Sequence, residues 1–257
     1  MEELGYRALW CSGGFDPGLA PRFERLLSAT KHAVVASGIV SIWRASPGEV
    51  ASGFADLEER HPGRFLLGLG VSHGPLVDNY ARPFDAMVRY LDALDSGSTS
   101  VPKDRRVLAA LGPRMLELAA SRTAGAHPYL VPVEHTAQAR ERLGPDPLLA
   151  PEATVVLDDD PIEARRRARA FLAMYLSLPN YTNNLRSMGF GDPDLVDGGS
   201  DRLVDAVVAW GDADAIAERV RAHFQAGADH VCIQVVPGSG DFPLDDYRRL
   251  APGLMSA

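Results

Sequence analysis

Two histidines are the residues best suited to acid–base chemistry in this sequence. His73 follows the apolar run at 65–71, and His127 lies within another apolar run, at 123–131. Histidine titrates near neutral pH, so a histidine at the end of a buried strand is a candidate catalytic proton donor or acceptor. Tyr129 can donate a hydrogen bond to a cofactor or a substrate. The alternative for each of the three is a structural role.

The elements that must position these side chains alternate in type along the chain. The run at 65–71 is too apolar for a half-exposed strand and leads into Ser72 and His73, as expected of a parallel strand that opens onto a site. Stretches with the 3.6-residue period of helices separate such runs. The pattern predicts an α/β fold, a (β/α)8 TIM barrel, with function at the strand ends. The predicted strands are 6–11, 33–39, 65–71, 107–111, 123–131, 154–157 and 231–236.

Two features depart from a regular barrel. Two or three helices follow one another between 161 and about 208 with no predicted strand, so we expect a helical insertion before the last strand. A closed barrel has eight strands, whereas seven are predicted here, and residues 2–5 resemble the last turn of a helix. We therefore expect the first strand and most of the first helix to be missing, which leaves two exposed strand edges.

Composition restricts the class of protein. The 257 residues are 46% hydrophobic and 23% charged, which is ordinary for a globular protein and is consistent with a single domain over 1–257. The net charge of −8 disfavours nucleic acid and anionic membranes as partners. The start of the chain lacks the pattern of a signal peptide, and no apolar stretch approaches the length of a membrane span. We therefore expect a cytoplasmic protein that acts on a small molecule.

The sequence gives little support for a metal site or for a catalytic lysine. Cys11 and Cys232 form no cluster with other metal ligands, so we expect two structural thiols and no metal site. The acidic triplet at 158–160 precedes a proline and suits the start of a helix. Lys31 and Lys103 lie outside the predicted strand ends, which argues against an aldolase- or isomerase-like barrel.

Six motifs follow one another along nearly the whole chain. They are LGYRALW at 4–10, ASGI at 36–39, GRFLLGLGVSH at 63–73, LAALGP at 108–113, GAHPYL at 125–130 and AGADHV at 226–231. Each is weak alone, but their order resembles that of the luciferase-like monooxygenase superfamily. The resemblance is strongest to its actinobacterial branch of coenzyme F420-dependent oxidoreductases.

This resemblance implies a barrel that holds a deazaflavin, coenzyme F420, across its C-terminal mouth, with the insertion as part of a lid. F420 carries a hydride, so the implied reaction is hydride transfer between the cofactor and a small organic substrate. Two alternatives remain, namely FMN with oxygen-dependent monooxygenation, and a barrel that has lost catalysis. Family members are often dimers, and the expected strand edges add a reason for a homodimer.

The resemblance also implies which residues bind the cofactor. Gly38 and Ile39 match the place where family members carry a non-prolyl cis peptide bond that supports the deazaflavin ring. Gly70, Val71 and Ser72 match the segment that approaches the phosphate side of the cofactor. Backbone without bulky side chains lets an anion reach N–H donors. Packing within the barrel is the alternative for both segments.

A third segment with the same implied role consists of Leu111, Gly112 and Pro113, which directly precede a predicted helix. Tyr129 completes the implied set through a hydrogen bond to cofactor or substrate. The polar and aromatic stretch at 180–184 lies in the insertion. It is expected either to line the mouth of the substrate site or to cap a helix.

One departure from the superfamily concerns the acid–base residues. Its sugar-phosphate dehydrogenases carry a histidine just after the second strand and a glutamate after the fourth. The matching stretches here read CSGG at 11–14 and SHGP at 72–75. That acid–base pair is therefore not carried over, and a sugar-phosphate substrate is unsupported.

Overall fold

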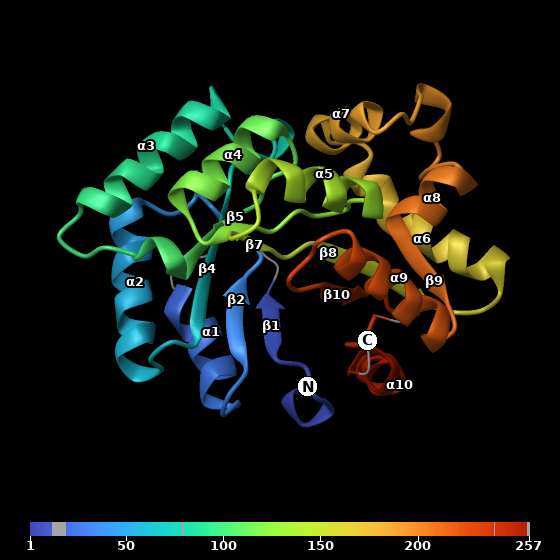
Figure 1. The fold of residues 1–257 in the computed structure, drawn as a ribbon, viewed down its shortest axis with the longest axis horizontal. Coiled ribbons are helices and arrows are strands. Elements are labelled where there is room, and N and C mark those ends of the chain that lie inside the picture. The colour runs from blue at the N-terminus through green and yellow to red at the C-terminus, as the bar shows by residue number, and fades with distance from the viewer. Residues whose placement is uncertain (12–18, 79, 239, 256–257) are drawn as a thin grey trace.

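Parallel strands curl around a common interior, and helices cover the outside of the curl (Figure 1). The computed structural model describes residues 1–257 except 12–18, 79, 239 and 256–257, so the stretch at 12–14 lies outside the described residues. The strands are β1 (Ala8–Cys11), β2 (Val34–Ser37), β3 (Val40–Ser41), β4 (Phe65–Gly70), β5 (Arg106–Leu108), β6 (Gly125–Ala126), β7 (Leu148–Leu149), β8 (Glu152–Leu157), β9 (Val208–Gly211) and β10 (Cys232–Val235). The helices are α1 (Leu19–Ser28), α2 (Pro47–Arg60), α3 (Pro83–Ser96), α4 (Pro113–Arg122), α5 (Val133–Leu143), α6 (Pro161–Tyr175), α7 (Pro179–Ser187), α8 (Asp201–Val207), α9 (Ala213–Gln225) and α10 (Leu244–Met255).

The strands follow the order of a β/α half-barrel. β1, β2, β4, β5, β6 and β7 are neighbours in one parallel sheet. Ala150 and Pro151 separate β7 from β8, and β8 pairs in parallel with β10. The segment 148–157 therefore acts as one bent strand that joins the two sheets. The predicted α/β class with a curled parallel sheet is confirmed.

β1 and β10 lie at the two ends of this curl. Among the described residues, no strand pairs with the outer edge of either one. The two strands border a groove of about 720 Å³. One hydrogen bond runs between Trp10, in β1, and His230, just before β10, with the indole N–H donating to Nε2 over 3.1 Å. The pair of free strand edges expected from the sequence is thus present in this part of the chain.

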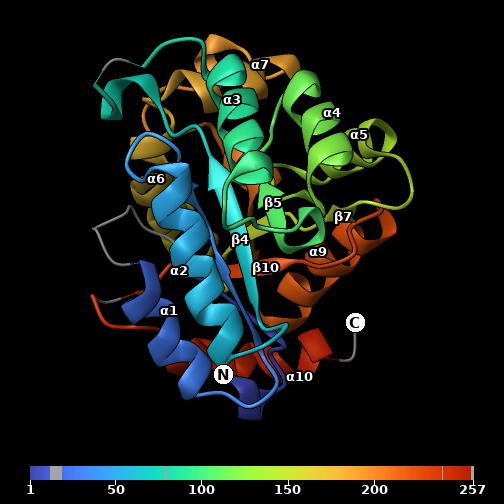
Figure 2. The same ribbon diagram turned by 90° about the vertical axis from the view of Figure 1, so that its left-hand side faces the viewer.

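β2 and β4 approach each other so closely that glycine is required at position 68. A Cβ on Gly68 would lie 2.0 Å from the carbonyl oxygen of Ser37. The Ser37 hydroxyl accepts from the Gly68 N–H (2.8 Å) and donates to its carbonyl (3.0 Å). Phe65, Leu67 and Leu69 are fully buried on the helix-covered face of β4, where α2 and α3 run across it (Figure 2). This packing holds β4 in place, and the carboxyl end of β4 leads to Ser72 and His73.

Several elements differ from the sequence-based expectation. No strand was predicted between the insertion and the helix that follows it, but Val208–Gly211 forms β9, which pairs with residues 154–157 of β8. The predicted strand at 123–131 is reduced to Gly125–Ala126. Pro128 lacks an N–H for pairing, and Leu130 has a φ of 56°, so the chain leaves the sheet there. The elements α5, β7 and α10 were not predicted.

The cysteines and the start of α6 can be compared with the expectations from the sequence. Cys11 and Cys232 are free thiols. No group of three or more His, Cys, Asp or Glu side chains is arranged to hold a metal ion among the described residues. Asp160 caps α6 by accepting the N–H of Ile162, as the acidic triplet suggested. No described helix combines the length and the apolar character that crossing a membrane would require.

Candidate functional site

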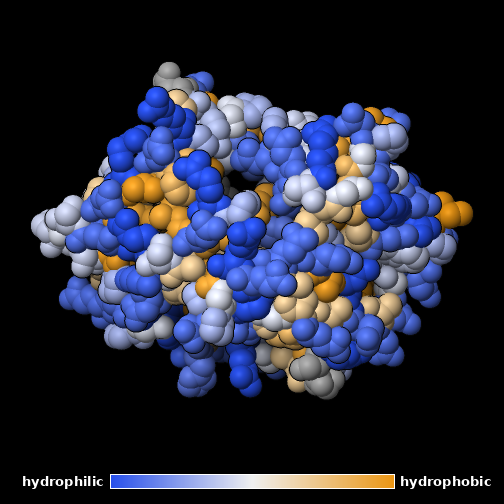
Figure 3. Space-filling view, turned by 45° about the horizontal axis from the view of Figure 1, so that its top comes forward, coloured by the Kyte–Doolittle hydropathy of each residue, from blue (hydrophilic) through white to orange (hydrophobic). Residues whose placement is uncertain are grey.

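A cavity of about 620 Å³ opens beyond the carboxyl ends of β2, β4, β5 and β6, with α6 and α7 of the insertion on its far side. Figure 3 shows a hollow in the hydrophilic surface at this end of the molecule. The structure brings every residue predicted for cofactor binding or catalysis to this one cavity. The lining residues are Gly38, Ile39, Gly70, Val71, Ser72, His73, Ala109, Ala110, Leu111, Gly112, Pro113, Met115, His127, Tyr129, Tyr175, Asn180, Tyr181, Asn183, Asn184 and Ser187.

Gly38 and Ile39 form one wall of the cavity. The peptide bond between them is cis, as the family resemblance implied. Ile39 packs on Gly70, because a Cβ on Gly70 would lie only 2.6 Å from Cδ1 of Ile39. Any larger residue at position 70 would displace the Ile39 side chain, so the glycine at the end of β4 sets the shape of this wall.

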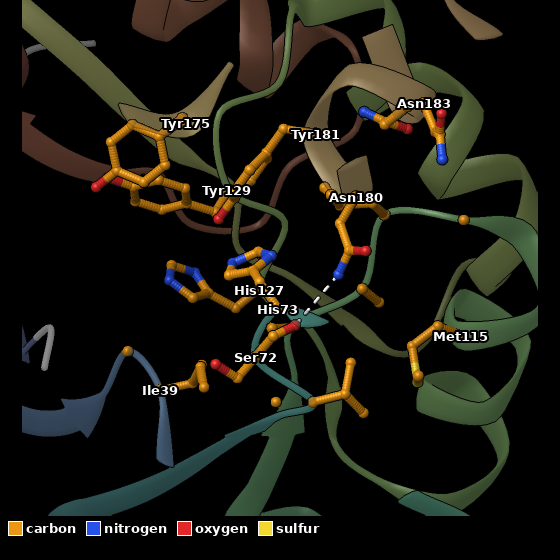
Figure 4. Close-up of a pocket in the computed structure, with 18 of the residues that line it drawn as sticks. Ile39, Ser72, His73, Met115, His127, Tyr129, Tyr175, Asn180, Tyr181 and Asn183 are labelled. Atoms are coloured by element: carbon orange, nitrogen blue, oxygen red, sulfur yellow. Dashed lines mark hydrogen bonds between the residues drawn. The ribbon is translucent and has the colours of Figure 1, made fainter. Parts of the chain in front are cut away.

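The chain that leaves β4 is held in place by two hydrogen bonds to its carbonyls. The indole N–H of Trp43 donates to the carbonyl of Val71 (2.6 Å). Nδ2 of Asn180, in α7, donates to the carbonyl of Ser72 (3.2 Å), as the dashed line in Figure 4 shows. Ser72 has a φ of 55°, which turns the chain at this point. The strand end is therefore tied to the insertion that closes the cavity.

The N-terminal end of α4 is open toward the cavity. Gly112 is the N-cap residue, and no side chain caps the helix. The first turn of α4 carries no acidic residue. A Cβ on Gly112 would meet no atom within 4 Å. Pro113 lacks an N–H and the Met115 N–H donates to the Gly112 carbonyl (3.1 Å), which leaves the Arg114 N–H to meet an anion at this end, where the helix dipole favours negative charge.

His127 is a neutral hydrogen-bond acceptor. Its Nδ1 lies 2.7 Å from the carbonyl of Ala150, so Nδ1 carries the proton and Nε2 keeps a lone pair. The indole of Trp10 stacks on the imidazole, with ring centroids 4.1 Å apart. Burial lowers the pKa of His127 to about 4. Nε2 lies beside Gly38, since a Cβ on Gly38 would be 3.5 Å from it.

His73 lies at the cavity in a different setting. Its Nδ1 is buried and has no hydrogen-bond partner among the described residues. Burial lowers the pKa of His73 as well, so this ring is also favoured in its neutral form. The imidazole packs against Tyr181, with ring centroids 4.9 Å apart.

Three tyrosines form an aromatic group at the cavity, which we call the tyrosine wall: Tyr129, Tyr175 and Tyr181 (Figure 4). Their ring centroids lie 5.3 to 6.1 Å apart. The Tyr129 hydroxyl lies 2.9 Å from both Oε1 of Gln234 and the hydroxyl of Tyr175. Burial raises the pKa of all three phenols, which therefore stay protonated. Tyr129, predicted to hydrogen-bond a ligand, has its hydroxyl engaged within the protein.

A buried carboxyl group lies close to the tyrosine wall. Glu152 is 2% exposed and accepts hydrogen bonds from the Thr154 hydroxyl (2.7 Å) and the Leu130 N–H (3.3 Å). Burial raises the pKa of Glu152 to about 7. Its charge also contributes to the raised pKa values of the three tyrosines. Glu152 was not singled out from the sequence.

Glu152 is expected to make the stability of the fold depend on pH. Because its pKa is raised in the folded state, the stability it confers is complete below pH 4.5 and is lost as the pH rises through about 7. The full loss is about 3 kcal/mol. The free energy of unfolding of the wild type, minus that of Glu152→Gln, should fall by this amount between pH 4.5 and pH 8. Urea denaturation of both proteins measures it, and a difference that is independent of pH would contradict the assignment.

The family of the chain is established by its match to a family model. The model of the luciferase-like monooxygenases matches residues 1–95 and 96–230. The chain belongs to the luciferase-like monooxygenase family. The resemblance inferred from the six motifs is thereby confirmed. A search of curated protein sequences found no match.

Solved structures with the same fold come from this kind of enzyme. An F420-dependent secondary alcohol dehydrogenase in complex with an F420–acetone adduct aligns with a TM-score of 0.76 at 16% identity, over 98% of this chain and 92% of that one. The coenzyme F420-dependent tetrahydromethanopterin reductase from Methanopyrus kandleri gives 0.69 at 15% identity, over 98% and 90%. The oxygenating constituent of 3,6-diketocamphane monooxygenase from Pseudomonas putida, in complex with FMN, gives 0.63 at 17% identity, over 97% and 87%. At these identities the likeness concerns the fold.

The sequence reasoning missed part of this luciferase-like site. Within the stretch at 180–184, Asn180, Tyr181, Asn183 and Asn184 do line the cavity, as one of its two interpretations proposed. Nothing in the sequence pointed to Tyr175 as a site residue. It is the last residue of α6, and an aromatic residue at a helix position is equally typical of core packing. Trp10 was noted only as part of a motif, and its stacking on His127 depends on contacts between strands far apart in the sequence.

Proposed function

We propose that the protein is an oxidoreductase that transfers a hydride between coenzyme F420 and a small organic substrate. The observation that carries this proposal is the convergence of Gly38, Gly70, Gly112 and His127 on one cavity. Membership of the luciferase-like monooxygenase family supports oxidoreductase chemistry. F420 is preferred to FMN because the motifs resemble the F420-dependent branch of the superfamily.

The residues present fit a cofactor with a flat ring and an anionic tail. The apolar surface around Ile39 and Met115 suits a ring system, and Gly112 leaves space above the open end of α4. The Arg114 N–H and the dipole of α4 would hold a phosphate there. Bound in this cavity, F420 would supply the hydride or accept it.

The protein's own groups then have distinct tasks. The Arg114 N–H at the start of α4 would hold the anionic part of the cofactor, and Ile39 would support one face of its ring. Nε2 of His127, which is neutral and unprotonated, accepts the proton of a substrate hydroxyl when an alcohol is oxidised and returns it when a carbonyl is reduced. The three tyrosines and His73, which line the cavity, exclude water from the reacting groups.

Titration with F420 and with FMN, followed by fluorescence, tests this proposal. Gly38→Val is expected to weaken F420 binding at least tenfold, because the valine methyl groups extend past a Cβ position already 3.5 Å from His127 and 3.7 Å from Trp10. Gly48→Val is the matched control, since a Cβ on Gly48 meets no atom within 4 Å and the residue lies outside the cavity lining. Circular dichroism checks that both variants are folded.

Each result of the titration has a definite meaning. Binding of F420 in preference to FMN, lost in Gly38→Val and kept in Gly48→Val, supports the proposal. Preference for FMN would instead indicate a flavin monooxygenase. Stoichiometric F420 binding without turnover of any alcohol or ketone would indicate a barrel that has lost catalysis.

A further inference from the structure

The cavity has two regions of different character. Ile39, Met115 and the end of α4 form the region assigned above to the cofactor. The tyrosine wall lies away from Ile39 and Met115 in Figure 4, with His73 and His127 between the two regions. The wall offers ring faces and edges, including a perpendicular pair made by Tyr175 and Tyr181 (87°). An aromatic ring prefers such surroundings, because offset and edge-to-face contacts are favourable.

The tyrosine wall lacks a positively charged group that would pair with an anion. None of the described residues that line the cavity is Asp, Glu, Lys or Arg. Glu152 accepts the N–H of Leu130, the residue after Tyr129, so its carboxyl group adds negative potential near the wall when it ionises. A carboxylate or phosphate at this end would therefore lose its hydration without gaining a partner charge.

One polar group at the wall has no partner. Tyr181 is 8% exposed, and its hydroxyl makes no hydrogen bond among the described residues. By contrast, the hydroxyls of Tyr129 and Tyr175 contact each other. Figure 4 shows Tyr181 extending from α7 toward His73 and His127. A phenol hydroxyl at a cavity that has no partner in the protein is free to donate to a ligand oxygen.

We infer that the tyrosine wall is the substrate subsite and that it selects an uncharged aromatic ketone or alcohol whose oxygen accepts a hydrogen bond from Tyr181. The inference rests on the proposed function, since it takes the remaining region of the cavity as the cofactor site. It assigns Tyr181 to substrate binding and Glu152 to the rejection of anionic analogues.

Three ketones that differ in one group each test the inference on the F420-loaded protein at pH 8. Acetophenone is the uncharged aromatic probe, phenylglyoxylate replaces its methyl group by a carboxylate, and cyclohexyl methyl ketone replaces its aromatic ring. Calorimetry should give acetophenone a dissociation constant at least tenfold lower than that of phenylglyoxylate and at least threefold lower than that of cyclohexyl methyl ketone. Equal or tighter binding of phenylglyoxylate, or no binding of acetophenone at millimolar concentration, would overturn it.

Variants separate the roles of the two residues. Tyr181→Phe should weaken acetophenone binding three- to tenfold by removing one hydroxyl. Tyr6→Phe is the matched control, because the Tyr6 hydroxyl donates to the Tyr247 carbonyl outside this cavity. Glu152→Gln should reduce the preference for acetophenone over phenylglyoxylate at least threefold. Equal acetophenone affinities in Tyr181→Phe and Tyr6→Phe would remove Tyr181 from the subsite.

The same titrations on cofactor-free protein distinguish this inference from the proposed function. If F420 fails to bind but acetophenone keeps its preference and its dependence on Tyr181, the proposed function fails and the aromatic subsite stands. If F420 binds and the ketones show no preference, the cofactor assignment stands and the subsite is wrong.

Discussion

Replacing His127 with asparagine is expected to slow hydride transfer about 100-fold or more, while the protein stays folded and binds its cofactor. The asparagine amide can keep the hydrogen bond to the Ala150 carbonyl that Nδ1 makes at 2.7 Å. It cannot reach the position of Nε2, so the proton acceptor beside Gly38 is lost. Single-turnover kinetics, followed by the absorbance of the cofactor with the substrate that the wild type converts fastest, measures the effect.

His127→Gln separates proton transfer from hydrogen bonding. The longer glutamine side chain places an amide oxygen near the position of Nε2, where it accepts a hydrogen bond but no proton. If His127 takes the substrate proton, both variants should be slow. A fast glutamine variant would reduce its role to hydrogen bonding, and a fast asparagine variant would exclude it from the reaction.

The pH dependence gives an independent check on His127. A pKa of about 4 means that the ring is already unprotonated at pH 5, so acid should slow alcohol oxidation, in which His127 acts as the base, only near pH 4. The wild-type single-turnover rate should therefore be constant between pH 5 and pH 6.5, where an exposed histidine would titrate. A rate that falls across this interval, and is constant in His127→Asn, would show that the ring is less buried than its contacts imply.

The sequence predicted the fold best where a strand is long enough to show its burial in its own residues. β4 reads as a continuous apolar run, because helices cover one of its faces and barrel neighbours cover the other. β6 and β7 have two residues each, and such short pairings depend on neighbouring strands that no local pattern encodes. β9 was missed for a related reason, since its pairing with β8 depends on the path of the preceding insertion.

The candidate site was predictable in so far as it lies at strand ends. Carboxyl ends of parallel strands meet at one edge of a barrel, so Gly38, Gly70 and His127 had to converge once the order of strands was known. Their cofactor and catalytic roles remain predictions. Tyr181 was noted only as part of the stretch at 180–184, because its place at the cavity depends on the docking of α7. Glu152 was beyond sequence reasoning, because its raised pKa depends on burial inside the barrel.

A negative charge at Gly112 should weaken F420 binding about 100-fold while leaving the fold as stable or more so. Gly112→Asp introduces a better N-cap for α4, which lacks a capping side chain, and this stabilises a helix by a few tenths of a kcal/mol. The same carboxylate enters open space at the end of the helix where we place the anionic part of the cofactor. Repulsion of about 3 kcal/mol between two such charges near a protein surface corresponds to the loss expected.

Gly112→Asn is the control that isolates charge from shape. Asparagine has nearly the same volume and caps a helix equally well, so its F420 affinity should stay within about fivefold of the wild type. Fluorescence titration at two salt concentrations strengthens the comparison, because screening should partly restore binding to the aspartate variant alone. Equal loss in both variants would mean that the side chain merely blocks the cavity, and full affinity in both would place the anionic group of the cofactor elsewhere. The opposite signs expected for stability and affinity in Gly112→Asp arise because one feature, the uncapped end of α4, would serve the ligand at the expense of the helix.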